Sequence, residues 1–307
     1  MLPALAVVAA AVLFGTTGTA QALGPDGTTP LGVGAMRLLL GGTVLAALGF
    51  GLAARHRRRP GAAPNPPLTR RAAGLMAVTG ICLAAYQPLF FLGTQRSGVA
   101  VGTVIALGSA PVLAGLLEWA LTRRIPRGAW MIATACALVG VALLAAAGGG
   151  GGSADPIGIL GSLGAGAAFA VFANAQRRLM DGGWDPFTVA GAMGLGSAVA
   201  ALPMLPFAPL GWLAEPSGIV MTLWLGLATI AVAYTLFTWG LQRLTAATAA
   251  TLTLAEPVTA ALLGILLLGE RLDPLAWLGL VVLTGGLVLL ARGSRTRGAP
   301  RAFPVEG

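Results

Sequence analysis

The sequence predicts an all-α polytopic membrane protein whose ten transmembrane helices form two inverted five-helix repeats. Three observations lead to this prediction. The composition is too apolar for a soluble protein, the chain contains ten apolar runs long enough to cross a bilayer, and a pattern in the first half recurs in the second.

The composition places the chain in the membrane. Of its 307 residues, 56% are hydrophobic and 9% are charged, and the mean hydropathy is +0.85, whereas about a quarter of the residues in soluble domains are charged. The net charge of +9 comes from arginines alone. Because nearly all of them flank apolar runs, we expect no nucleic-acid partner. One histidine and no lysine leave little material for acid–base pairs or metal ligands, so we predict no enzyme activity, no metal and no cofactor.

Ten runs have the roughly 20 apolar residues that a membrane helix needs, with polar or Gly/Pro segments between them. The Ala20-Gln21-Ala22 sequence resembles a signal-peptidase site, but no arginine precedes the apolar stretch, so we treat it as the first span. The predicted spans are 3–23, 31–52, 72–92, 98–121, 128–147, 157–179, 187–208, 217–240, 247–269 and 274–291.

The arginines predict the orientation. If the N-terminus is cytoplasmic, 16 arginines fall on the cytoplasmic side and only Arg96 and Arg271 on the other. Cytoplasmic loops carry the excess of basic residues in membrane proteins. We therefore expect a multi-pass protein of the plasma or inner membrane with both termini in the cytoplasm.

The two halves look like copies. FFLGTQR, which begins at Phe90, recurs as FTWGLQR 147 residues later, and Trp130 recurs as Trp277 at the same spacing. Three such matches in order indicate a repeat. Because each copy holds five spans, the second copy must enter the membrane from the opposite face. The predicted parts are a first repeat at 1–148, a Gly-rich linker at 149–156, a second repeat at 157–291 and a basic cytoplasmic tail at 292–307.

The third match pairs Ala110-Pro111-Val112 with Glu256-Pro257-Val258. Proline breaks a helix ladder, and paired broken helices in the two halves of a transporter point to its binding region. We therefore predict helix breaks at Pro111 and Pro257; the alternative is an ordinary packing kink. Glu256 lies roughly 14 Å into its span. A charge at that depth is costly and indicates a functional site for substrate or a proton, unless the carboxyl group only holds the kink.

Arg37 is the one arginine within an apolar run. It could attract an anionic group, pair with Glu256, or extend toward the interface. Most single threonines in membrane helices bond their own backbone, whereas amide side chains have more groups to satisfy. The remaining candidates for the substrate or proton site are Tyr86, Gln87, Asn174, Tyr234, Thr238, Trp239 and Thr253.

FGTTGTAQAL early in the chain, Met36-Arg37-Leu38 in the second span and AEPVTAALLGILLLGERL near the end resemble the EamA-type branch of the drug/metabolite transporter superfamily. The resemblance implies a secondary transporter of a bacterial inner membrane, commonly an exporter of amino acids or related metabolites. It implies a cavity lined by spans one, three, four, six, eight and nine, and it assigns the family's Glu-Pro pair to Glu256 and Pro257 and its arginine to Arg37.

This sequence departs from the family pattern in two places. Ala110 stands where a first-half glutamate would be, and Phe14-Gly15 stands where the family commonly has Trp-Gly. We expect a permease that exports small metabolites, such as amino acids or related compounds, by alternating access, as a monomer or homodimer in the lipid bilayer, with proton coupling permitted by Glu256. The alternative is a membrane sensor or structural protein that does not transport.

Overall fold

The structure, a computed structural model, describes residues 2–61, 64–97, 99–123, 128–147, 155–269 and 273–293, and within these residues every regular element is a helix. Nine helical spans there are long and apolar enough to cross a membrane, and α12 adds a further apolar helix. The elements are α1 (Leu2–Ala22), α2 (Pro30–Arg57), α3 (Arg70–Ser97), α4 (Val99–Thr122), α5 (Gly128–Ala147), α6 (Pro156–Asp181), α7 (Pro186–Ala201), η1 (Leu202–Phe207), η2 (Gly211–Ala214), α8 (Pro216–Gly226), η3 (Leu227–Val232), α9 (Ala233–Leu241), α10 (Ala246–Leu252), α11 (Ala255–Leu268) and α12 (Pro274–Gly293).

The starts of three helices follow from one local pattern, a capping residue followed by proline. Thr29 accepts a hydrogen bond from the Gly32 N–H at 3.1 Å, and Asp155 accepts one from the Ile157 N–H at 2.9 Å. Asp185 does the same at the start of α7. The capping oxygen accepts from a free N–H group of the first helical turn. Proline suits that turn because it has no N–H group that would need a partner. These patterns fix the beginnings of α2, α6 and α7 within one residue of the predicted spans.

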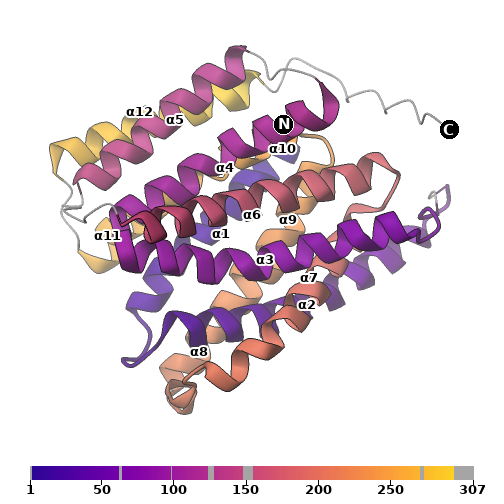
Figure 1. The fold of residues 1–307 in the computed structure, drawn as a ribbon, viewed down its shortest axis with the longest axis horizontal. Coiled ribbons are helices and arrows are strands. Elements are labelled where there is room, and N and C mark those ends of the chain that lie inside the picture. The colour runs from indigo at the N-terminus through magenta and orange to yellow at the C-terminus, as the bar shows by residue number, and fades with distance from the viewer. Residues whose placement is uncertain are drawn as a thin grey trace.

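Two helix pairs flank a central group of helices (Figure 1). α2 packs on α7 at one side, and α5 packs on α12 at the other. Between them, α3 and α4 pack on α6, and α1 packs on α9 and α11. Exchanging the first five spans for the last five reproduces this pattern of contacts, as expected for two repeats that enclose a common interior.

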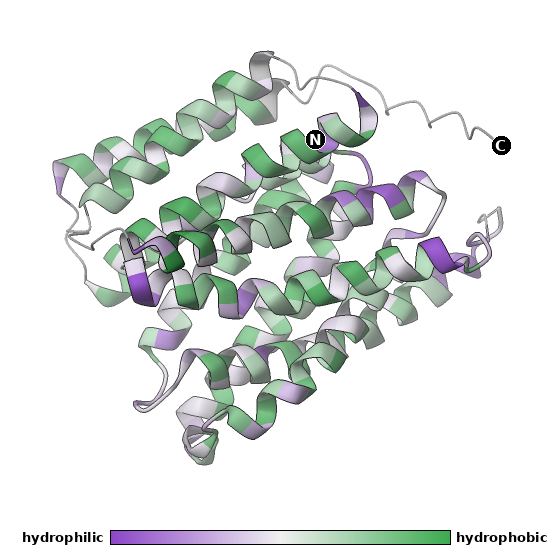
Figure 2. Cartoon of the chain, viewed as in Figure 1, coloured by the Kyte–Doolittle hydropathy of each residue, from purple (hydrophilic) through white to green (hydrophobic). Residues whose placement is uncertain are grey.

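The outer pairs approach closely because glycines face each other. A Cβ atom on Gly42 of α2 would lie 2.7 Å from the carbonyl oxygen of Gly194 in α7, and one on Gly140 of α5 would lie 2.7 Å from that of Gly279 in α12. Small residues let membrane helices pack backbone against backbone. Apolar residues cover the helices, while hydrophilic ones gather at helix ends (Figure 2).

Two spans of the second half are irregular. Span eight contains a π-helical segment, η3, between α8 and α9, and span nine is divided into α10 and α11 by Thr253 and Leu254. The predicted break at Pro111 is wrong, since α4 continues through that proline. Proline removes one N–H donor, and the neighbouring ladder bonds together with packing against α6 keep the helix continuous. Residues 149–154 of the predicted linker and 294–307 of the predicted tail lie outside the described residues.

Candidate functional site

Glu256 lies at the break in span nine, ten residues from its start at Ala246 and twelve from its end at Leu268. The turn is tight: the Glu256 N–H donates to the Thr253 carbonyl at 2.9 Å. Pro257 is the third residue of α11, where its missing N–H group costs little. A Cβ atom on Gly15 of α1 would lie 2.6 Å from the Glu256 carbonyl oxygen, so α1 packs directly against the break.

Arg37 of α2 lies in the electrostatic field of Glu256. Both residues are half-buried. Arg37 and Glu256 do not form an ion pair with each other: no Arg37 nitrogen lies within 4.0 Å of a Glu256 oxygen, and the ion pairs among the described residues involve other side chains. The Arg37 Nε atom is buried and has no hydrogen-bond partner within the described part of the chain. The arginine therefore does not extend away to the interface, and the opposite charges stay apart inside the bundle.

Two tyrosines share this field. Tyr86 of α3 and Tyr234 of α9 interact electrostatically with both Arg37 and Glu256. The structure thus gathers four of the predicted residues from four different spans into one cluster, which we call the charged cluster: Arg37, Tyr86, Tyr234 and Glu256.

Aromatic rings support the cluster. The Tyr234 ring lies 5.0 Å from that of Phe14 and 5.9 Å from that of Phe172, measured between centroids, and Tyr86 stacks on Phe90 at 5.8 Å. Tyr234 is the second residue after η3. A π-helical segment adds a residue to a turn and is frequent at functional sites; here it precedes the residue that joins span eight to the cluster.

Gln87 is adjacent to Tyr86 and buried. A Cβ atom placed on Gly34, one helical turn before Arg37 in α2, would lie 3.7 Å from the Gln87 Cβ atom. Its amide makes no hydrogen bond to any described residue. Its amide atoms are not among the fully buried polar atoms that lack a partner, so the amide is accessible, and Gln87 remains a candidate beside the charged cluster.

Three other predicted residues have their polar groups occupied by the protein. The Asn174 amide donates to the carbonyl oxygens of Ala114 and Ala170, at 3.2 and 2.9 Å, and so ties α6 to α4. Thr238 donates to the Gln176 side chain at 3.0 Å. Thr253 donates to the Ala250 carbonyl within its own turn at 2.7 Å. These bonds give the three side chains a part in helix packing and in the turn; their part in the site stays a prediction.

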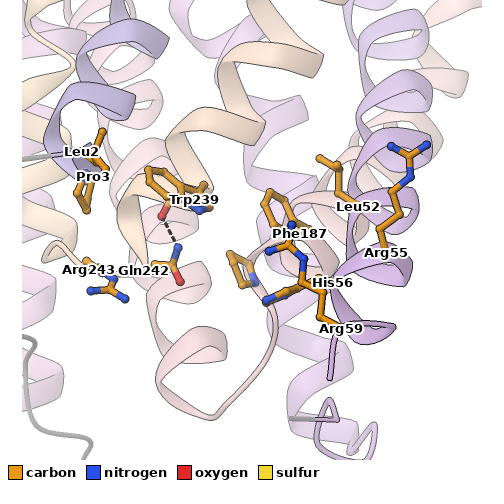
Figure 3. Close-up of a pocket in the computed structure, with 11 residues that line it drawn as sticks. Leu2, Pro3, Leu52, Arg55, His56, Arg59, Phe187, Trp239, Gln242 and Arg243 are labelled. Atoms are coloured by element: carbon orange, nitrogen blue, oxygen red, sulfur yellow. Dashed lines mark hydrogen bonds between the residues drawn. The ribbon is translucent and has the colours of Figure 1, made fainter. Parts of the chain in front are cut away.

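Trp239 lies outside the charged cluster. It lines a separate cavity of about 760 Å³ at the end of the bundle where α1 begins (Figure 3). This cavity contains none of the residues of the charged cluster.

Three residues at that end were not predicted. Gln176 is fully buried, accepts from Thr238 and donates to the Met193 sulfur. Glu118 of α4 accepts from the Ala247 N–H at 3.1 Å and so caps α10. Arg177 of α6 pairs with Asp181 at 2.6 Å and donates to carbonyl groups at the end of α9. Glu118 lies within the predicted span 98–121, so it could have been identified from the sequence as a charge inside an apolar run.

A discontinuous helix and opposed charges within a bundle of apolar spans define a multi-pass membrane protein of the transporter class. The chain belongs to the EamA-like transporter family, whose sequence profile matches residues 1–146 and again residues 156–292. This confirms the predicted family and the fold of two five-helix repeats, with a small molecule as substrate.

Relatives are similar over nearly the whole chain. The Uncharacterized transporter YwfM of Bacillus subtilis is 39% identical over 291 residues, covering 95% of this chain and 94% of YwfM. The Threonine/homoserine exporter RhtA of Escherichia coli is 30% identical over 303 residues, covering 94% of this chain and 89% of RhtA. A solved crystal structure superposes with a TM-score of 0.77, over 95% of this chain and 97% of that one; at 21% identity it supports the fold alone.

Proposed function

We propose that this protein exports small zwitterionic amino acids by alternating access. One observation carries the proposal: Arg37 and Glu256 are opposite charges inside the bundle that interact electrostatically without forming an ion pair. An amino acid bears a carboxylate and an ammonium group a few ångströms apart. In the proposed complex its carboxylate binds Arg37 and its ammonium group binds Glu256.

The chemistry of the cluster favours this ligand. A guanidinium group binds a carboxylate through parallel N–H bonds, and charge-assisted bonds are the strong ones. Tyr86 and Tyr234, which interact with both charges, pack their rings on Phe90 and Phe14, and an apolar environment strengthens electrostatic attraction relative to water. A phosphate would call for more cations than Arg37 alone. Similarity to RhtA, named as a threonine and homoserine exporter, also supports an amino acid as substrate.

The break beside Glu256 supplies a place for movement. α10 and α11 are separate helices joined by two residues, and α11 packs on α1. In transporters built from inverted repeats, one group of helices rocks against the other around a midplane site. Glu256 can exchange the substrate's ammonium group for a proton as the site opens to either face, which would couple export to proton entry.

We further propose that the protein lies in the inner membrane with both termini in the cytoplasm. The support is the excess of arginines, 16 against two, on the side that this orientation makes cytoplasmic. In intact cells, a membrane-impermeant thiol reagent should label an Asp26→Cys variant and spare an Arg58→Cys variant. The opposite labelling would contradict the orientation.

Counterflow in proteoliposomes tests the transport function. Vesicles loaded with unlabelled threonine should accumulate radiolabelled threonine. Glu256→Gln and Arg37→Gln should each reduce the rate at least about tenfold, as expected for loss of a charged hydrogen-bonding partner. The matched control is Glu215→Gln, which neutralises an exposed carboxylate. If neither threonine nor any other zwitterionic amino acid exchanges, a sensor or structural role replaces transport.

A further inference from the structure

The cavity at the end of the bundle is cationic. Arg55, Arg59 and Arg243 line it together with His56. Arg55 lies in the last turn of α2, Arg59 just beyond that helix, and Arg243 just beyond α9. Two helix ends thus contribute three arginines to the lining of one cavity; in Figure 3, Arg243 lies across the opening from Arg55 and Arg59.

Nothing in the described part of the chain neutralises these arginines. None of the three makes an ion pair with a described residue, and none of the described residues that line the cavity bears a carboxylate. Asp185, next to the lining residues Pro186 and Phe187, pairs with His56 and accepts from the N–H groups of Phe187 and Thr188, so its carboxylate already has partners other than the three arginines. All three arginines are exposed, so water screens their mutual repulsion, and together they give the cavity a positive potential that attracts an anion.

The rest of the lining is apolar. Leu2, Pro3, Leu52, Phe187 and Trp239 make up most of it. A volume of about 760 Å³ lies within the roughly 300–1,000 Å³ of small-molecule sites. The cavity lies at helix ends, where spans leave the hydrocarbon region, and tryptophan and arginine are typical of that interface. The ligand should therefore be both anionic and amphipathic.

We propose that this cavity binds the headgroup of an anionic phospholipid. Guanidinium groups bind phosphate oxygens in a bidentate manner, and basic pockets between membrane helices are suited to lipid headgroups. The arginines hold the phosphodiester, and the apolar wall formed by Phe187, Trp239 and Leu52 takes the glycerol and the first acyl carbons. This site is separate from the charged cluster, so it does not depend on the proposed substrate.

Native mass spectrometry of the detergent-solubilised full chain, titrated with phosphatidylglycerol or with phosphatidylcholine of the same acyl chains, tests the proposal. Wild type should bind phosphatidylglycerol at least about tenfold more tightly than phosphatidylcholine. The combined Arg55→Gln, Arg59→Gln and Arg243→Gln variant should lose that preference, since each arginine near an anionic surface contributes about fivefold. The control neutralises Arg58, Arg70 and Arg71, which bear equal charge and do not line the cavity.

Three outcomes would overturn the proposal: equal binding of the two lipids, an equal loss of preference in the control variant, or displacement of the lipid by inorganic phosphate at comparable concentration. The last would assign the cavity to a soluble phosphate. If the combined variant does not fold, each single substitution should still weaken binding by about fivefold. If the protein exchanges threonine but shows no lipid preference, the lipid-binding proposal is wrong while the proposed transport function still holds.

Discussion

Arg37 and Glu256 come from spans two and nine, interact electrostatically inside the bundle, and form no direct ion pair. A closed pair would satisfy both charges and leave neither for a ligand. An open pair within a low-dielectric interior is costly, and a zwitterion in the gap would offset that cost. The separation of these two side chains is therefore the feature from which the proposed function follows.

We expect Thr238 to contribute to the stability of the protein and not to its affinity for substrate. Thr238→Val keeps the side chain's shape but removes the donor to buried Gln176. An unsatisfied buried group costs about 1–3 kcal/mol, so thermal unfolding in detergent should show that loss, with threonine affinity unchanged. Thr235→Val is the control, because that hydroxyl bonds the Ala231 carbonyl of its own helix. Weaker threonine binding by Thr238→Val at wild-type stability would instead place Thr238 in the site.

Arg177 should hold the connection between α9 and α10. Its guanidinium donates to the carbonyls of Leu241 and Leu244, at 3.0 and 3.2 Å. Arg177→Met leaves these carbonyls without that donor, so we expect a loss of about 2 kcal/mol and faster trypsin cleavage after Arg243. Arg178→Gln, an exposed neighbour, should change neither. Equal cleavage rates in the two variants would remove this role from Arg177.

The two matched prolines should differ in effect. Pro111→Ala restores an N–H group within continuous α4, so it should raise stability by roughly 1–3 kcal/mol. Pro257→Ala lies in the first turn of α11, where proline costs little. It should change stability by less than about 1 kcal/mol, yet slow threonine counterflow because the break becomes easier to close into one helix. Measuring unfolding and counterflow for both variants separates the roles, and a reversed order of effects would contradict them.

The positions of the helices could be predicted from the sequence. The continuity of α4 through its proline and the π-helical segment could not. Capped prolines such as Asp155-Pro156 and Asp185-Pro186 start helices by local chemistry, so the spans could be predicted closely. Whether a helix survives a proline depends on packing, which is why Pro111 was misjudged. Nothing in LATIAV at Leu227–Val232 signals a π-helical segment.

The site could be predicted in part for a similar reason. Arg37 and Glu256 were identifiable because a charge in an apolar run needs an explanation. One of the two partners of Asn174, Ala114, lies 60 residues away, and the partner of Thr238 lies 62 residues away; those contacts exist only in the folded bundle. Sequence alone could not separate amides and hydroxyls that hold helices together from those left for a ligand.

The most direct test of the open charge pair compares threonine with two analogues, threoninamide, which lacks the carboxylate, and 3-hydroxybutyrate, which lacks the ammonium. Binding to the detergent-solubilised protein would be measured by calorimetry. Arg37→Gln should weaken threonine at least about tenfold and leave threoninamide unchanged, because the lost partner is the carboxylate's. Glu256→Gln should weaken threonine and leave 3-hydroxybutyrate unchanged. If each variant weakens threonine and both analogues equally, the two residues do not divide the ligand's charges between them, and the account is wrong.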